Sequence, residues 1–295
     1  MRNLSEITTK SDKPLLCMEL NPPRGTDLNL ALSKLEGELD GIDFLNVTDC
    51  ALAKLRMAAL PTAAIVKQRL QIEPLVNLSC RDRNTIALQS DLLAAWAQGV
   101  RSVVALTGDA VTTGDNPNAK GVFEINSIGL LKIIGSLRAG HDSTGIPLRG
   151  GADFLPGVVV NPNVKNPAAE LRRLTKKREA GARYALSQPV FDREVAVSFL
   201  KEAQAVGIPI FLGLLPLKTI GAAKHVSDIP GIKMADSVLS QLSGENDRDV
   251  SEFFLELCVG LAKSTAPLVA GFHVIGGATP RLGLQLAREL VRVFK

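Results

Sequence analysis

The sequence predicts an α/β fold, a (β/α)8 barrel formed by one domain over residues 1–295. Two observations carry this prediction. Short apolar or β-branched runs alternate with longer segments of helical period, and the alternation repeats eight times along the chain. The length also suits a barrel of roughly 250 residues with extensions, although length alone would allow two domains.

The eight strands are expected where the apolar runs lie. The runs "LLCMEL" and "SVVALTG" are typical, because each is short, largely apolar and followed by polar or turn-forming residues. In chain order, the expected strands cover residues 15–20, 42–48, 73–80, 102–108, 155–161, 183–188, 209–215 and 271–276.

The segments between the strands predict helices. The first three are expected near residues 28–39, 58–70 and 84–98. Pro61 lies near the first turn of the second helix, and Gly99 follows the third as a C-cap. Such caps fix where a helix starts and stops, so they support the alternation of strand and helix.

Three connections differ from the simple alternation. The interval before the last strand holds two amphipathic segments, 234–244 and 247–264, which predict an extra helix before strand eight. Residues 109–124 have no period and are rich in Gly, Asn, Asp and Thr, so we expect a loop over the mouth of the barrel. Residues 140–153 form a second glycine-rich connection, expected at the opposite end because it joins a helix to the next strand.

The composition favours a protein that binds small anionic molecules rather than nucleic acid. Aromatic residues make up only 4% of the chain, which leaves little surface for stacking bases. The 34 basic and 30 acidic residues give a net charge of +4 without a basic tail, a modest excess for a polyphosphate partner. We therefore expect no nucleic-acid partner.

Cysteine usage and hydropathy predict a cytoplasmic protein. The four cysteines are far apart, with no CxxC pair and no histidine at ligand spacing, so we expect neither a metal site nor a disulfide framework. No apolar run approaches the roughly 20 residues that span a bilayer, and the N-terminal segment is too polar for a secretory signal.

Polar side chains end most of the predicted strands, and the active site of such a barrel lies where its strands end. A carboxylate such as Glu19 at the end of an apolar run is costly unless it is paired or put to use. As an alternative to a role in catalysis, Glu19 could form an ion pair with Arg24 or Arg81. The complete set of strand-end residues is Glu19, Thr48, Asp49, Cys80, Arg81, Asp82, Thr107, Asp109, Asn161, Ser187, Gln188 and His273.

For three of the other candidates, a role in the fold alone is also open. Asp109 follows a tight turn and could cap the next segment. Gln188 precedes a proline and could satisfy loose backbone groups. His273 stands within an apolar strand and could be a hydrogen-bonded core histidine. Because the chain also lacks GxGxxG after a strand, GxxxxGK[ST], GxSxG and HExxH, short motifs leave the reaction open.

Seven stretches in order resemble the motif series of the methylenetetrahydrofolate reductase family. The resemblance covers nearly the whole chain and is closest to the short bacterial reductases, which consist of the reductase domain alone. Each stretch is weak by itself, but seven in this order with barrel-like spacing are specific. The stretches are "ELNPPRG", "NVTD", "NLSCRDRN", "ALTGD", "GARYALSQPVFD", "GLLPL" and "GFHVIGG".

The resemblance implies a TIM barrel that binds flavin adenine dinucleotide (FAD) and acts as an oxidoreductase in one-carbon metabolism and methionine biosynthesis. NADH or NADPH gives a hydride to the flavin and leaves. Methylenetetrahydrofolate then takes that hydride and becomes methyltetrahydrofolate. A homo-oligomer or an electron-transfer partner subunit is compatible with the resemblance.

The resemblance also implies roles for three strand-end residues. Glu19 matches the general acid, which protonates N10 of the folate so that the five-membered ring opens to a 5-iminium cation. Desolvation at an apolar strand end is expected to raise the pKa of Glu19 toward working pH. Asp109 matches the acid near the pyrimidine edge of the flavin, where its charge tunes the flavin and stabilises the cation. Gln188 matches the amide that contacts folate and nicotinamide.

Further cofactor contacts follow from the same resemblance. Thr48 matches a flavin contact, and Asp109 belongs to the cofactor site as well. Glu170, Lys176 and Lys177 fall where the family binds ribityl and phosphate groups, which gives the basic run "RRLTKK" a purpose.

Three positions in the cofactor site depart from the bacterial pattern. Asn77 stands where a histidine often lies, and Asn161 and Lys165 replace a tyrosine and a histidine that contact the cofactor. Lys165 could still pair with a phosphate. These departures keep two other functions open: a flavin-poor folate-binding subunit that needs an electron-transfer partner, and a folate-linked methyltransferase on the same barrel.

Overall fold

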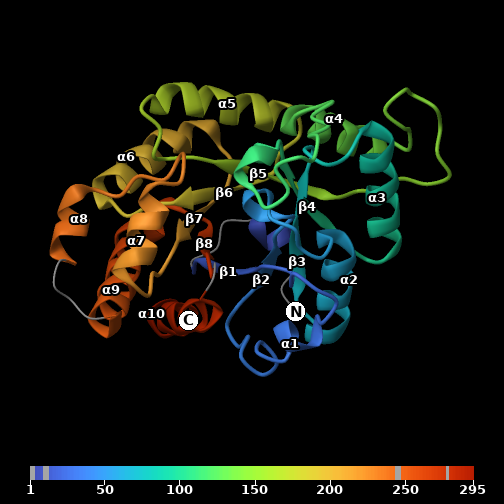
Figure 1. Ribbon diagram of the computed structural model, residues 1–295. Helices are drawn as coiled ribbons and strands as arrows, with labels where there is room; N and C mark the ends of the chain where they lie inside the picture. The colour runs from blue at the N-terminus through green and yellow to red at the C-terminus, as the bar shows by residue number, and fades with distance from the viewer. Residues whose placement is uncertain (1–3, 9–12, 243–246, 277–278) are drawn as a thin grey trace.

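Eight parallel strands close into a barrel in which each strand pairs with the next along the chain and β8 pairs with β1 (Figure 1). The structure is a computed structural model that describes residues 4–8, 13–242, 247–276 and 279–295. The predicted (β/α)8 barrel is confirmed. Its strands are β1 Leu15–Leu20, β2 Phe44–Val47, β3 Glu73–Ser79, β4 Ser102–Leu106, β5 Leu155–Val160, β6 Tyr184–Pro189, β7 Ile210–Leu214 and β8 Gly271–Val274.

The two faces of each strand contribute to different cores. On β1, Leu16 and Met18 join the large cluster between strands and helices, whereas Leu15 and Cys17 join a smaller cluster inside the barrel. This follows because successive side chains of a strand point to opposite faces. Ile7, in the 3-10 turn Leu4–Ile7, packs into the inner cluster and is buried. Ile7 therefore closes the end of the barrel where the strands begin.

Helices surround the strands (Figure 1). Several begin on a side-chain cap: Asn84, Asn126, Asn166 and Asp192 each accept a backbone N–H of the following first turn. Asn84, Asn166 and Asp192 follow their strands within six residues and so fix the helix starts near the carboxyl ends of those strands, whereas Asn126 comes after the long loop that follows β4. The helices are α1 Asn29–Leu32, α2 Ala59–Leu70, α3 Thr85–Ala97, α4 Ser127–Arg138, α5 Pro167–Glu179, α6 Arg193–Ala203, α7 Ile220–Ser227, α8 Asp236–Gln241, α9 Asp247–Thr265 and α10 Pro280–Phe294.

The helix expected near residues 28–39 is shorter than predicted. Only the single turn α1 is regular, and the chain then continues in turns. Gly37 has a φ of +78°, which a right-handed helix cannot include. The prediction of a helix through this segment was therefore wrong after Leu32.

The extra helix predicted before strand eight is confirmed, since α8 and α9 both precede β8, and α7 adds a third helix in the same interval. Residues 109–124 contain only the 3-10 turn Val111–Thr113, which confirms the expected loop after β4. The connection 140–153 joins α4 to β5, at the end of the barrel where strands begin, as predicted.

Some expectations fall on residues outside the described part. They are the end of the segment 234–244 from residue 243, Gly277 of "GFHVIGG", and residues 1–3 and 9–12 of the N-terminal segment. Among the described residues, no helix has both the length and the apolarity to cross a membrane.

Candidate active site

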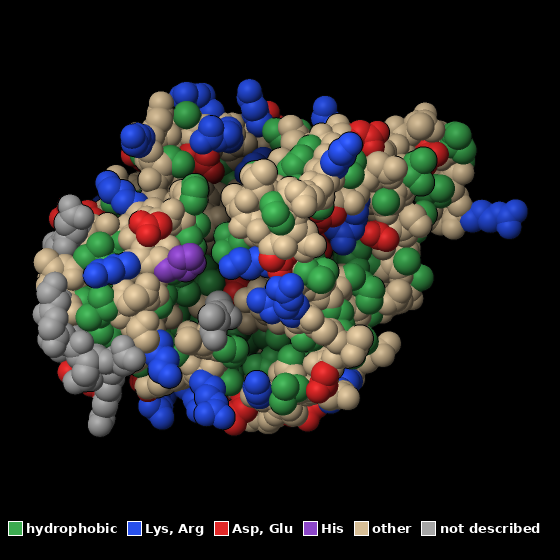
Figure 2. All heavy atoms as spheres, viewed as in Figure 1, with side chains coloured by type: hydrophobic (Ala, Val, Ile, Leu, Met, Phe, Trp, Pro, Cys, Tyr) green, Lys and Arg blue, Asp and Glu red, His purple; other side chains and the backbone are tan. Residues whose placement is uncertain are grey.

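The mouth of the barrel, meaning the end where the strands finish, changes from an apolar floor to a polar rim. Figure 2 shows a hollow near the middle of one face, with hydrophobic side chains deep inside and charged side chains at its edge. On β2, the inward-facing Phe44 is followed two residues later by Asn46. On β3, Leu75 is followed in the same way by Asn77. The inner face therefore becomes polar as each strand reaches the mouth.

Glu19 lies on this inner face, as the fifth residue of β1, and is partly buried. Burial raises the pKa of the Cys17 thiol, and the negative charge of Glu19 raises it further, so the two side chains face the same interior. Asn21 Nδ2 donates a hydrogen bond of 3.0 Å to Glu19 Oε1. The two arginines considered as partners of Glu19, Arg24 and Arg81, are paired with other carboxylates.

Two hydrogen-bonded groups join β1, β2 and β3 at the mouth. Thr48 Oγ1 donates to Asn21 Oδ1 at 2.5 Å, so two successive hydrogen bonds link Thr48 through Asn21 to Glu19. Beside it, Asn46 Nδ2 donates to Asn77 Oδ1 at 2.8 Å. Because each side chain is held by its neighbour, the positions of the Glu19 and Asn77 side chains are set before any ligand arrives.

Asp109 follows β4 at the mouth and is exposed. Its Oδ2 accepts the backbone N–H of Leu52 at 3.0 Å, so Asp109 caps the neighbouring loop after β2 rather than its own next segment. Leu52 has a φ of +54°, and Cys50 and Ala53 beside it are also left-handed, at +45° and +54°. Such conformations are unfavourable for residues with a side chain, so the hydrogen bond that Asp109 accepts from Leu52 helps to hold this loop.

Gln188 lies in β6, and its side chain is exposed at the mouth. Its amide makes no hydrogen bond to another residue in the part of the chain that the structure describes. Gln188 therefore does not satisfy the loose backbone groups considered above. Ser187 fixes the backbone here, because its Oγ donates to Gln188 O and accepts from Gly213 N, both at 2.8 Å. The barrel thus brings Glu19, Asp109 and Gln188 to one mouth.

An ion pair between the buried Asp49 and the partly buried Arg83 lies behind this rim. Asp49, whose side chain is 1% exposed, accepts from Arg83 Nη1 at 2.7 Å and from Ser79 N at 2.9 Å. Gly108, with a φ of +99°, approaches Ser79 so closely that an added Cβ would overlap Ser79 Oγ. The turn that carries Asp109 therefore packs directly on the end of β3.

Most of the predicted cofactor-binding residues after β5 already form hydrogen bonds with other residues of the protein. Asn161 Nδ2 donates to Gly231 O at 2.8 Å, and Asn161 N donates to Glu170 Oε1 at 3.0 Å. Glu170 is buried and also pairs with Arg173. Lys165, in the loop between β5 and α5, is exposed.

The two lysines of α5 differ from each other. Lys177 Nζ donates to Val159 O at 2.7 Å, and burial lowers the pKa of this lysine. Lys176 is exposed in the last turn of α5. Of these two lysines, only Lys176 is therefore exposed to solvent.

His273 faces the inside of the barrel in β8 and is 5% exposed. Neither ring nitrogen has a hydrogen-bond partner among the described residues, so His273 is not the hydrogen-bonded core histidine considered above. Burial lowers its pKa from 6.5 to about 4. The other two histidines, His141 and His225, are exposed.

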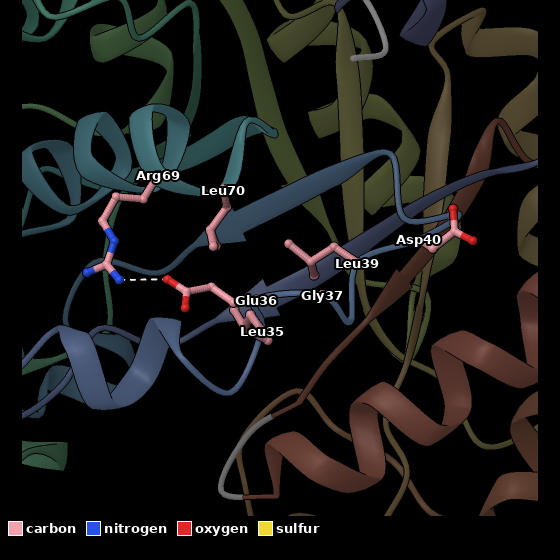
Figure 3. A pocket seen from close by; sticks show the side chains of 7 residues that line it. All are labelled: Leu35, Glu36, Gly37, Leu39, Asp40, Arg69 and Leu70. Atoms are coloured by element: carbon pink, nitrogen blue, oxygen red, sulfur yellow. Dashed lines mark hydrogen bonds and ion pairs between the residues drawn. The ribbon is translucent and has the colours of Figure 1, made fainter.

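A second depression lies at the opposite end of the barrel, between the α1–β2 connection and the end of α2 (Figure 3). It has a volume of about 330 Å³ and is lined by leucines such as Leu35, Leu39 and Leu70. An ion pair of 2.6 Å between Arg69 and Glu36 lies across it. None of the predicted site residues reaches this depression. Across the described ranges, no group of His, Cys, Asp and Glu side chains could hold a metal ion.

Sequence reasoning missed two residues of the mouth, Asn21 and Asn46. Asn46 is 1% exposed within the otherwise apolar strand "FLNV", at an inward-facing position. A polar residue at that position of a buried strand is the signal that could have identified it. Asn21 gave no comparable signal, because its role depends on the bonds to Glu19 and Thr48 across two strands.

Known proteins share sequence with most of this chain. The chain is 26% identical over 240 residues to 5,10-methylenetetrahydrofolate reductase of Salmonella typhimurium, covering 78% of this chain and 74% of that protein. It is 25% identical over 237 residues to the Escherichia coli protein of the same name, covering 78% and 73%.

A solved structure supports the fold. An uncharacterised protein from Clostridium thermocellum, described as binding two copies of 5-methyl-5,6,7,8-tetrahydrofolic acid, superposes with a TM-score of 0.65 at 15% identity and covers 96% of both chains. The family model described as methylenetetrahydrofolate reductase matches residues 4–278. The chain belongs to the methylenetetrahydrofolate reductase family.

Proposed function

We propose that this protein reduces 5,10-methylenetetrahydrofolate to 5-methyltetrahydrofolate with electrons from NADH or NADPH, using FAD as its cofactor. One observation carries the proposal: a chain of this family has a partly buried acid, an exposed acid and an exposed amide at one barrel mouth. FAD, when bound, would accept hydride from the nicotinamide and pass it to the folate.

Glu19 is the proposed proton donor to N10 of the folate. Its Oε1 accepts the hydrogen bond from Asn21, which orients the carboxyl group. Asn21 is in turn held by Thr48, which fixes the direction in which Glu19 offers that proton. A proton donor held in this way loses little orientational freedom when the substrate binds. Thr48 and Asn21 thus act as positioning residues.

Asp109 and Gln188 are the proposed contacts for charge and orientation. A carboxylate at the mouth favours the cation that ring opening creates, and an exposed amide can donate to and accept from a heterocycle. Asp109 now accepts the N–H of Leu52, so it would bind the ligand with its second oxygen or release that loop.

The residues of the mouth suit a flavin ring better than its diphosphate. Asn77 lies in β3 and Asp109 follows the adjacent strand β4, so both offer polar groups to the edge of a planar ring. Of the lysines predicted to bind the diphosphate, Lys165 and Lys176 are exposed, whereas Lys177 donates to Val159 O. We propose that Thr48, Asn77, Asp109, Asn161, Lys165, Glu170, Lys176 and Lys177 line the cofactor site.

The second candidate function is a folate-binding subunit that holds flavin weakly and receives electrons from a partner protein. The observation that favours it is that Asn161, Glu170 and Lys177 are engaged within the protein. Reduction assays of the isolated chain, with and without added FAD, distinguish the two candidates. Activity that requires a second protein even at saturating FAD supports the partner-dependent function.

The variant Glu19→Gln tests the proposed acid. Bound flavin should still bleach with NADH or NADPH, because that half-reaction needs no proton from Glu19, but methylenetetrahydrofolate should no longer restore its colour. The exposed Glu202 of α6 gives a matched control, Glu202→Gln, which should behave as the wild type in both half-reactions. Loss of both half-reactions together in Glu19→Gln would contradict the role as acid.

A further inference from the structure

His273 is a buried polar side chain whose hydrogen bonds are not made by the protein. It is 5% exposed, and neither Nδ1 nor Nε2 has a partner among the described residues. Buried polar groups are almost always hydrogen-bonded, because an unmade bond in the interior costs free energy. An imidazole in this state requires an explanation beyond packing.

The position of His273 connects it to the proposed site. In register it pairs with Cys17 of β1 on one side and with Gly213 of β7 on the other. Gly213 has no side chain to place beside the ring, and the next inward-facing residue of β1 toward the mouth is Glu19. Strand spacing puts the Cα atoms of His273 and Glu19 roughly 8 Å apart, with His273 deeper in the barrel.

The chemistry of the ring suits recognition rather than proton donation. Because burial lowers the pKa of His273 to about 4, the imidazole is neutral at pH 7 and offers one N–H donor and one nitrogen acceptor. A half-turn about Cβ–Cγ exchanges each nitrogen with a carbon in the same space, so the ring can present a nitrogen in two directions. No described side chain competes for either nitrogen.

We propose that His273 is a substrate-binding residue at the floor of the mouth, where its neutral ring hydrogen-bonds a polar edge of the nitrogen heterocycle that Glu19 protonates. This inference rests on the proposed function. It adds a recognition contact: a ligand ring with a donor or an acceptor directed into the barrel is bound, and an apolar ring of the same shape is rejected. The cost of the unmade bonds in the free protein is recovered when that ligand binds.

Binding of methyltetrahydrofolate, measured by titration calorimetry with equal FAD in every sample, tests the proposal. His273→Leu removes both polar atoms at similar volume and should raise Kd by about tenfold or more, the loss of one good hydrogen bond. His273→Gln can still donate and accept and should bind within about threefold of the wild type. The exposed His225 gives the control His225→Leu, which should bind as the wild type does.

Thermal unfolding without ligand provides a second readout. His273→Leu removes the unsatisfied nitrogens, so its midpoint should equal or exceed that of the wild type although its affinity is lower. Should His273→Leu not fold, His273→Met provides the same test with a more adaptable apolar side chain. If the wild type binds methyltetrahydrofolate and the apolar variant binds it with the same Kd, the role of His273 is overturned and the proposed function stands. A wild type that binds no folate overturns both.

Discussion

Replacing His273 with leucine should remove part of the acid sensitivity of the fold. In the folded chain, burial lowers the pKa of His273 from 6.5 to about 4, whereas in the unfolded chain the ring regains its ordinary value. Between these two pH values the unfolded state binds a proton that the folded state does not. The neutral, buried ring therefore contributes stability that is present above pH 6.5 and is lost as pH falls toward 4.

The size of the effect follows from the two pKa values. Each pH unit in that window is worth about 1.4 kcal/mol. The wild type should lose about 2 kcal/mol from this residue between pH 6.5 and 5, and about 3 kcal/mol by pH 4. Other titrating groups contribute equally to wild type and variant, so the difference between the two proteins isolates His273.

Urea unfolding of the wild type and His273→Leu at pH 7 and pH 5 measures this difference. The wild type should lose about 2 kcal/mol more than the variant on going to pH 5. His225→Gln, at the exposed histidine of α7, should keep the pH dependence of the wild type. An equal loss in wild type and His273→Leu would refute the reasoning, because it would mean that the ring is already protonated or accessible to water in the folded state.

Three further predictions concern the ion pair behind the mouth, a glycine inside the barrel and the Cys80 thiol. Asp49→Asn removes the buried charge that pairs with the partly buried Arg83 and should lower the unfolding free energy by about 3 kcal/mol, measured by urea denaturation. Gly157→Ala would overlap the ring of Tyr184 inside the barrel and should lower the same quantity by about 1–3 kcal/mol. Because burial raises the pKa of Cys80 to about 11, iodoacetamide at pH 8 should label it only after urea unfolds the protein, as mass spectrometry would show. Rapid native labelling of Cys80 would contradict its burial.

The strands and the mouth could be predicted from local sequence. Each strand is a short apolar run, and polar residues at the run ends identified Glu19, Asp109 and Gln188, which the barrel places at one mouth. The single-turn α1 was not predicted, because the apolar spacing of residues 28–39 matches a helix while the backbone at Gly37 excludes one. Periodicity reports which residues face the core, but it does not report whether the backbone there is regular.

The partners of the site residues could not be predicted, because they lie far apart along the chain. Thr48 bonds Asn21 at a distance of 27 residues, and Asp109 bonds the backbone of Leu52 at a distance of 57. The basic run of α5 read as a phosphate site, yet Lys177 is bonded to Val159 O of β5. Whether a polar group is hydrogen-bonded depends on which residues of the neighbouring strand lie beside it, and that depends on the register of the barrel.

The sequence by itself determined the closed barrel of eight parallel strands, the end that carries the polar residues, and the family. These follow from the alternation of apolar runs with helical segments and from motifs that each lie within a few consecutive residues. Only the tertiary structure decided which of those polar groups are held by the protein and which remain available. It showed that Thr48 is engaged with Asn21, whereas His273 is enclosed in the barrel with both nitrogens unpaired among the described residues. The physical reason is that a hydrogen bond depends on the distance between two atoms in space, which the order of residues along the chain does not specify.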